Sequence, residues 1–202
     1  NMKIAIYDLL GPVGNFGPWD ESESAFTPLE QKLKEYNPNL TAETELETEE
    51  KMIEDHPDYL QPTEGFAETA LSYRRNGIVP VIVTSGSERL SELYLERVVE
   101  EYNSRTGENI SVEDLVASEN VHIVTESKKD SDTWSEAMCK YEGDDIIVLY
   151  EDSLPNLEAA MEGLDIEQGV HVTYDDSGLV EEGEDIVKGS MSEAQDYVEN
   201  SD

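Results

Sequence analysis

The sequence predicts an α/β protein with a Rossmann-like three-layer arrangement, in which helices cover both faces of a mainly parallel sheet. Short apolar runs rich in β-branched residues alternate with amphipathic helical patterns along most of the chain. The runs show almost no polar alternation, which is typical of parallel strands buried on both faces. Five strands are expected, at residues 4–7, 78–83, 121–124, 146–150 and 170–174.

The helices between these strands are indicated by apolar residues at helical spacing. Phe66, Ala70 and Tyr73 share one face of a helix that Gly77 ends, since glycine commonly follows the last helical turn. The same period recurs at residues 90–102, 134–141 and 157–164. Strand and helix therefore alternate throughout residues 62–174, as a βαβ architecture requires.

Between Val13 and Pro62 the alternation stops. This part of the chain has two helical stretches, near residues 26–36 and 42–55, and little strand character. The sequence therefore predicts a core formed by residues 1–13 and 62–202, with a helical insertion at residues 14–61.

The last stretch of the chain, from about residue 177 to 202, is acidic and interrupted by glycine and serine. One helix is expected there, at residues 192–198. We expect this stretch to pack loosely on the core.

Net charge excludes two classes of partner. The 202 residues carry 13 Lys and Arg against 48 Asp and Glu, a formal charge of −35 that is spread along the whole chain. Such a surface repels phosphate backbones and anionic lipids, so neither nucleic acid nor a membrane surface is expected as a partner. The sequence carries no signal for the oligomeric state.

Acidity distributed in this way, with few lysines, is typical of cytoplasmic proteins from salt-accumulating halophiles. Disorder and nucleic-acid mimicry are the alternatives; the regular apolar strands oppose the first. The single cysteine, Cys139, excludes an internal disulfide, and we expect a reducing compartment. We expect no signal peptide and no membrane span, because the longest apolar runs have the length of a strand.

Polar residues directly follow the predicted strands. In an open parallel sheet, binding and catalytic residues usually lie at this carboxyl edge. The polar residues are Asp8, then Thr84, Ser85 and Gly86, then Lys128 and Lys129, and finally Glu151, Asp152 and Ser153. A carboxylate can attack phosphorus, a hydroxyl and an ammonium can hold phosphoryl oxygens, and further carboxylates can bind Mg²⁺. Each residue is ordinary alone: a strand-end aspartate is commonly solvated, and threonine or serine commonly forms a turn.

The order of these residues resembles the haloacid dehalogenase-like (HAD) hydrolases. The run from Asp8 to Val13 is similar to the first family motif, a nucleophilic aspartate at a strand end, and residues 81–85 resemble the second, an apolar strand ending in threonine or serine. Lys128 resembles the third motif, a lysine before a helix, although the usual prolines are missing and Lys129 is the alternative. The stretch 148–160, with its acidic pair, is similar to the fourth.

The resemblance implies a fold, a reaction and a set of site residues. A phosphorylated small metabolite or nucleotide would be attacked by Asp8, and the aspartyl-phosphate would then be hydrolysed. The catalytic residues implied are Asp8, Thr84, Lys128 and Lys129; Leu10, Ser85 and Gly86 would bind substrate; Mg²⁺ would lie among Asp8, the Leu10 carbonyl, Glu151 and Asp152. The insertion at residues 14–61 lies where this family places a small helical cap.

One departure from the family pattern leaves two functions open. Phosphatases of this family have a second aspartate two residues after the nucleophile, which protonates the leaving oxygen, and this chain has Leu10 there. Loss of general acid–base assistance typically lowers a rate by 10²–10⁴-fold. The sequence therefore predicts either a phosphohydrolase or a catalytically impaired binding or regulatory protein, with dehalogenase and phosphonate chemistry as lesser alternatives.

Overall fold

The computed structural model describes residues 1–20 and 24–199, and a seven-stranded sheet forms its centre. The strand order is β5-β4-β1-β6-β7-β9-β8, and the paired strands run parallel except for β8 and β9. The strands are β1 (Lys3–Tyr7), β4 (Ile78–Thr84), β5 (Val121–Ile123), β6 (Asp145–Glu151), β7 (Ile166–Val172), β8 (Val180–Gly183) and β9 (Ile186–Gly189). The mainly parallel sheet confirms the predicted fold class.

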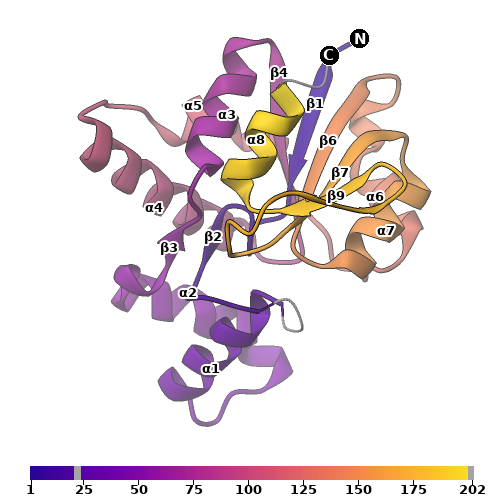
Figure 1. Cartoon of the computed structure of the whole chain (residues 1–202). Helices are drawn as coiled ribbons and strands as arrows, with labels where there is room; N and C mark the ends of the chain where they lie inside the picture. Colours follow the sequence, from indigo (N-terminus) through magenta and orange to yellow (C-terminus); the bar gives the residue numbers. More distant parts are fainter. Residues whose placement is uncertain (21–23, 200–202) are drawn as a thin grey trace.

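Helices cover both faces of the sheet (Figure 1). One face carries α3 (Phe66–Arg75), α4 (Glu88–Thr106), α5 (Val112–Leu115) and α8 (Met191–Glu199), and the other carries α6 (Ser131–Ala137) and α7 (Leu154–Gly163). Each face has its own apolar cluster. Tyr7 belongs to the first and Ile6 to the second, because successive side chains of a strand point to opposite faces.

β1 lies between β4 and β6, and the register of these three strands brings their carboxyl ends together. Tyr7 is level with Ile82 of β4 and with Tyr150 of β6. The backbone N–H of Asp8 continues this ladder by donating to the Tyr150 carbonyl at 3.0 Å. Asp8 therefore lies beside the residues that end β4 and β6.

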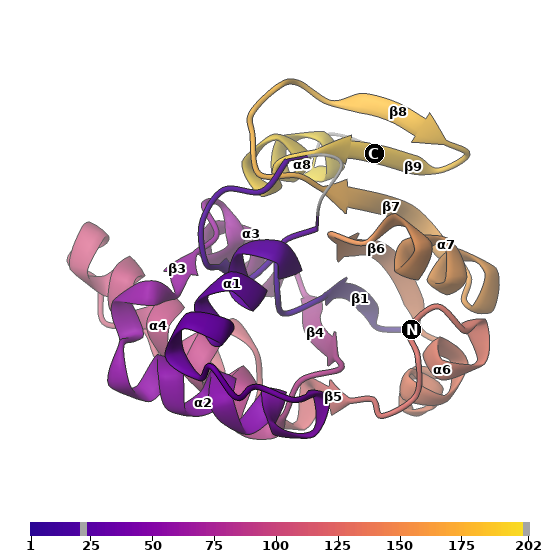
Figure 2. The same cartoon turned by 90° about the horizontal axis from the view of Figure 1, so that it is seen from below.

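The chain between β1 and α3 forms a helical pair at the carboxyl edge of the sheet. It contains α1 (Phe26–Tyr36) and α2 (Glu45–Asp55), and the short strands β2 (Gly14–Asn15) and β3 (Gln61–Pro62) pair antiparallel where it leaves and re-enters the core. Figure 2 shows α1 and α2 lying across the end of the sheet. Leu29 and Leu33, one turn apart, are buried on α1.

The C-terminal stretch corrects one expectation, because it packs firmly rather than loosely. β9 pairs parallel with β7, and α8 buries Met191 and Ala194, whose exposed fractions are 1% and 0%. In β9 the adjacent Ile186 and Val187 are buried against opposite faces of the sheet, and in α8 Met191 and Ala194, three residues apart, share one buried face. The acidic composition of this stretch hides both patterns. Residues 200–202 lie outside the described residues.

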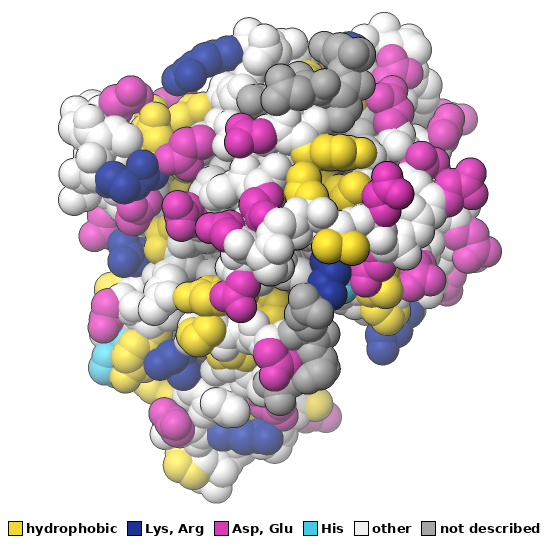
Figure 3. Space-filling view, viewed as in Figure 1, with side chains coloured by type: hydrophobic (Ala, Val, Ile, Leu, Met, Phe, Trp, Pro, Cys, Tyr) yellow, Lys and Arg dark blue, Asp and Glu magenta, His cyan; other side chains and the backbone are white. Residues whose placement is uncertain are grey.

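The surface shows the acidity that composition predicts. Acidic side chains are spread over the face seen in Figure 3, among few lysines and arginines. None of the helices in the described part of the chain combines the length and apolar character that crossing a bilayer requires.

Candidate active site

Lys128 connects the ends of three strands. Its ammonium group donates to Oδ1 of Asp8 at 2.9 Å, to Oε2 of Glu151 at 2.8 Å and to the carbonyl of Val83 at 3.2 Å. The Lys128 side chain is only 4% exposed, and those of Asp8 and Glu151 are 13% and 0% exposed. A buried ammonium group needs such partners, because desolvating an unpaired charge is very unfavourable.

Three carboxylates gather around this lysine. One oxygen each from Asp8, Glu151 and Asp152 lies within 4.8 Å of the others. Both oxygens of Glu151 have partners, since Oε1 accepts from the Ser153 N–H at 3.3 Å while Oε2 accepts from Lys128. Glu151 therefore holds the lysine in place, while Oδ2 of Asp152 accepts from the Ala25 N–H at 3.3 Å.

The loop after Asp8 passes so close to Asp152 that only glycine fits at position 11. Gly11 has a φ of 100°, and a Cβ there would lie 2.7 Å from Cβ of Asp152. Thr63 donates its hydroxyl to the Gly11 carbonyl at 2.5 Å. This packing positions the backbone of the loop next to the Asp152 carboxylate.

The pKa values reflect three acids sharing one cation. Burial opposes ionisation of Asp8, but the neighbouring Lys128 charge and hydrogen bonds outweigh it and lower the Asp8 pKa. Burial, followed by the Asp8 charge, raises the pKa of Glu151 to about 7. Burial and the charges of Asp8 and Glu151 raise the Asp152 pKa well above its usual value. The cluster therefore holds more negative charge than Lys128 balances.

This donor set suits a hard divalent cation. Mg²⁺ prefers oxygen ligands and is usually held by one or two carboxylates together with water and substrate oxygens. Asp8 and Asp152 offer carboxylate oxygens, and a cation there would offset the negative charges that, after burial, raise the Asp152 pKa. Asp8 and Asp152 are therefore suitable ligands for Mg²⁺.

The residues that end β4 have separate roles. Thr84 is buried, and its Oγ1 accepts from the Gly86 N–H at 2.9 Å, so the side chain shapes the turn and can still donate its own hydrogen. Ser85 is exposed. Of the predicted residues Thr84, Ser85 and Gly86, only Thr84 has a side chain buried at the end of the strand.

The structure decides between the two predicted lysines. Lys128 lies inside the cluster, whereas Lys129 is exposed to solvent. Lys128 is also held by Trp134 on α6, whose indole N–H donates to the Lys128 carbonyl at 2.8 Å and whose ring centre lies 4.9 Å from the ammonium nitrogen. Trp134 begins the apolar stripe predicted over residues 134–141, which gave no indication of its contact with Lys128. A buried indole N–H needs an acceptor, and that need is the signal for this second role.

No family model and no curated protein matches the sequence. Solved structures do match over nearly the full length of both chains. A hydrolase from Pseudomonas syringae is 16% identical over 100% of each chain with a TM-score of 0.63, and a HAD phosphatase from Thermococcus onnurineus is 17% identical over 98% of each chain with a TM-score of 0.58. D,D-heptose 1.7-bisphosphate phosphatase from B. bronchiseptica, complexed with magnesium and phosphate, is 12% identical over 100% of each chain with a TM-score of 0.53.

This chain has the HAD-like fold. The fold that the four motifs predicted is confirmed, and the motif residues Asp8, Lys128 and Asp152 come together at one edge of its sheet. Leu10 is half-buried and packs against the apolar core, and it forms a backbone bridge with Gly14. An aliphatic side chain in this place of the HAD-like fold cannot transfer a proton.

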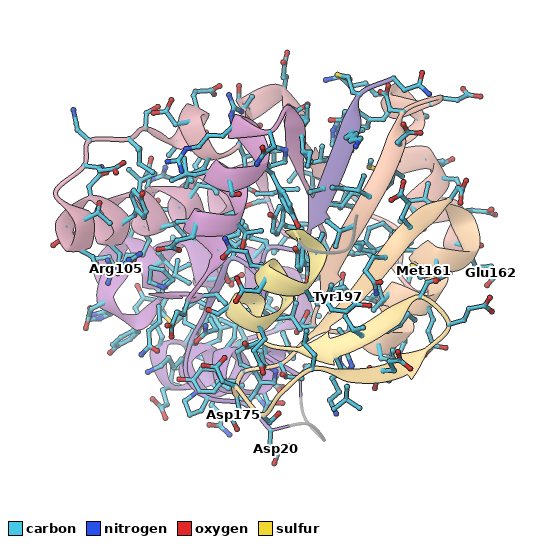
Figure 4. All side chains as sticks on the ribbon, turned by 45° about the horizontal axis from the view of Figure 1, so that its top comes forward. Asp20, Arg105, Met161, Glu162, Asp175 and Tyr197 are labelled. Atoms are coloured by element: carbon cyan, nitrogen blue, oxygen red, sulfur yellow. The ribbon has the colours of Figure 1, made fainter. Side chains whose placement is uncertain are left out.

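A cavity of about 550 Å³ adjoins the Asp152 side of the cluster. Trp19 and Tyr174 form part of its wall, with ring centres 5.2 Å apart in an edge-on arrangement. Figure 4 shows Asp20 and Asp175, two acidic residues of the lining, on the same side of the molecule. Trp19, in the segment that leads from the core into the helical insertion, thus lies in the wall of this cavity.

Proposed function

We propose that this chain is a Mg²⁺-dependent HAD-like phosphohydrolase that acts on a small phosphorylated metabolite or nucleotide. The observation that carries the proposal is the contact between the buried Lys128 and the partly buried Asp8, beside Asp152 at the carboxyl edge of the sheet. The structural neighbour from B. bronchiseptica, which is itself a phosphatase complexed with magnesium and phosphate, supports the same chemistry. We further propose that residues 14–61 form a cap that admits the substrate.

The reaction we propose runs through a phosphorylated Asp8. An Asp8 carboxylate oxygen forms a bond to phosphorus while the bond from phosphorus to the leaving oxygen breaks, and the leaving oxygen keeps the electron pair. Water then attacks phosphorus, the bond to Asp8 breaks, and inorganic phosphate leaves. The lowered pKa of Asp8 keeps the nucleophile ionised at neutral pH.

Three residues stabilise the phosphoryl group in this proposal. The Lys128 ammonium and the Thr84 hydroxyl donate to its oxygens, and Glu151 keeps Lys128 in place. Asp8, Asp152 and the Leu10 carbonyl would hold Mg²⁺, which supplies positive charge against the transferring phosphoryl oxygens. Glu151, predicted as a metal ligand, is assigned instead to positioning the lysine because both its oxygens have partners.

A phosphatase assay with a panel of phosphomonoesters, Mg²⁺ and about 1 M KCl tests this function, since that salt screens the acidic surface. We expect Asp8→Asn to lower kcat/KM by roughly 10³-fold or more, because the amide is a poor nucleophile. Asp145→Asn, which changes an exposed aspartate of β6, is the matched control. Turnover that survives in Asp8→Asn would refute the nucleophile assignment.

Leu10 favours a second candidate, a HAD-like binding or regulatory protein with impaired catalysis. In this case the wild-type chain would bind Mg²⁺ and inorganic phosphate at the cluster but would not turn over any substrate of the panel. Leu10→Asp would then create measurable activity, because it restores a proton donor two residues after Asp8. Efficient turnover by the wild-type chain would exclude this candidate.

A further inference from the structure

A buried acid and a buried phenol join the helical pair to the core. Glu49 of α2 is 6% exposed and Tyr94 of α4 is 1% exposed, and the Tyr94 hydroxyl donates to Oε1 of Glu49 at 2.9 Å. Among the described residues no lysine, arginine or histidine forms an ion pair with Glu49. Burying an acid without a cation is unfavourable, so a purely structural role would be served better by an apolar pair.

Tyr94 packs on the loop that carries Leu10. A Cβ added at Gly14 would lie 3.2 Å from Cδ2 of the Tyr94 ring, and Gly14 forms a backbone bridge with Leu10. The Gly14 carbonyl also accepts from the Gly11 N–H at 2.9 Å, within the turn that follows Asp8. The Tyr94 ring therefore lies against Gly14, whose backbone is bridged to Leu10, the position at which phosphatases of this fold have their proton donor.

Electrostatics agree with this location. Burial and the Glu49 charge are the largest causes of a raised Tyr94 pKa, and the charges of Asp8 and Asp152 raise it further. The Tyr94 hydroxyl, which is hydrogen-bonded to Glu49, is therefore also affected by the charges of both site aspartates.

We propose that Tyr94 and Glu49 supply the leaving-group proton that Leu10 cannot supply. This inference rests on the proposed phosphohydrolase function. When Glu49 is in its acid form the hydrogen bond reverses, so that the Glu49 carboxyl donates to the Tyr94 oxygen and the Tyr94 O–H is free to donate elsewhere. As the bond from phosphorus to the leaving oxygen breaks, the Tyr94 O–H proton passes to that oxygen, and the Glu49 proton passes to the Tyr94 oxygen. The Glu49 carboxylate then recovers a proton through Tyr94 from the water that hydrolyses phosphorylated Asp8, so the cycle closes.

The protonation state of Glu49 suits this task. Burial raises its pKa to about 7; the Tyr94 hydrogen bond opposes the rise and the charges of Glu45 and Glu50, also on α2, add to it. The acid form is thus available near neutral pH and is lost as the pH rises through about 7. A proton donor is most effective when its pKa lies near the working pH. We expect an alkaline fall in kcat/KM near pH 7 that Glu49→Gln removes.

Leaving-group chemistry separates this role from a structural one. The p-nitrophenolate ion leaves without a proton, whereas the alkoxide of glycerol 3-phosphate needs one. We expect Glu49→Gln and Tyr94→Phe each to lower kcat/KM for glycerol 3-phosphate by roughly 100-fold and for p-nitrophenyl phosphate by less than about threefold. Thermal unfolding midpoints verify that both variants fold.

Glu54→Gln is the matched control, because Glu54 lies on the same helix and contacts the core through Arg89 at 3.2 Å on the exposed surface. We expect it to leave both substrates and the pH profile unchanged. Equal losses on both substrates in Glu49→Gln and Tyr94→Phe, or an alkaline limb that persists in Glu49→Gln, would overturn the proton-donor role while leaving the phosphohydrolase intact. A wild-type chain without turnover on any phosphomonoester would instead overturn the proposed function, and this inference with it.

Discussion

Lys128 is the residue on which the candidate site depends most. Of the lysines and arginines in the described residues, it alone is buried. Its ammonium group contacts the buried carboxylate of Glu151 and the partly buried carboxylate of Asp8, and its backbone carbonyl accepts from the Trp134 indole N–H. Burial opposes its charge, but the charges of Asp8 and Glu151 outweigh the cost of burial and raise the Lys128 pKa, which favours the ammonium form.

Adjacent lysines provide a matched pair of variants. We expect Lys128→Met to lower kcat/KM by roughly 10²–10³-fold, as loss of one charge-stabilising donor does, and to destabilise the fold by about 3 kcal/mol because Asp8 and Glu151 lose their cation. Lys129→Met should change neither property, because Lys129 is exposed. Kinetics and urea unfolding in the same salt measure both. Equal effects of the two variants would contradict the placement of Lys128.

At the scale of single residues, the order of the motifs in the sequence identified Asp8 and Asp152 as site residues, but it did not decide which of two adjacent lysines enters the site. Asp8 and Asp152 each follow a recognisable apolar strand, so their edge of the sheet was predictable. Lys128 and Lys129 lie in a loop without periodicity, and which one turns inward depends on contacts with β1, β6 and α6. Glu151 likewise was predictable as a strand-end acid, but its partner was not.

Among the secondary-structure elements, β9 and α8 show how composition can hide packing. The sheet continues beyond β7 through β9, and α8 packs on α3. The predicted last strand, residues 170–174, begins instead at Ile166. Its first half contains the polar Glu167 and Gln168, which obscured the apolar pattern, and the Gln168 side chain donates to the Asp185 carbonyl at 2.9 Å.

Met191 tests whether this C-terminal packing contributes to stability. We expect Met191→Ala to lower the free energy of unfolding by about 2–5 kcal/mol, as truncation of a buried side chain does. Val180→Ala, on β8 where the side chain is 58% exposed, should cost less than about 1 kcal/mol. Denaturant unfolding compares the two variants. A negligible effect of Met191→Ala would restore the expectation of a loosely packed tail.

For the whole molecule, net charge sets the conditions in which the fold is stable. A charge of −35 on 202 residues repels itself across the surface. The Debye length falls from about 10 Å at 0.1 M salt to about 3 Å at 1 M, which screens this repulsion. The same charge acts against the approach of a phosphorylated substrate, so salt should also assist binding.

Stability should therefore rise with salt. We expect the thermal unfolding midpoint to increase by several degrees between about 0.1 M and about 1 M KCl, since a few kcal/mol of screened repulsion shifts a domain of this size by that amount. An equal osmolality of sucrose, which leaves charge interactions unscreened, is the control. A midpoint that responds equally to sucrose and KCl would contradict an electrostatic origin.

The sequence by itself determined the parallel sheet and the edge at which the site lies. Buried parallel strands need continuous apolar runs, and the residues after those runs must meet at one edge. Only the tertiary structure decided that Lys128 rather than Lys129 turns inward, that Glu151 holds it, and that Glu49 meets Tyr94. These contacts join residues that are 23 to 120 positions apart in the sequence. They depend on how one element packs on another, and a local sequence pattern contains no information about that packing.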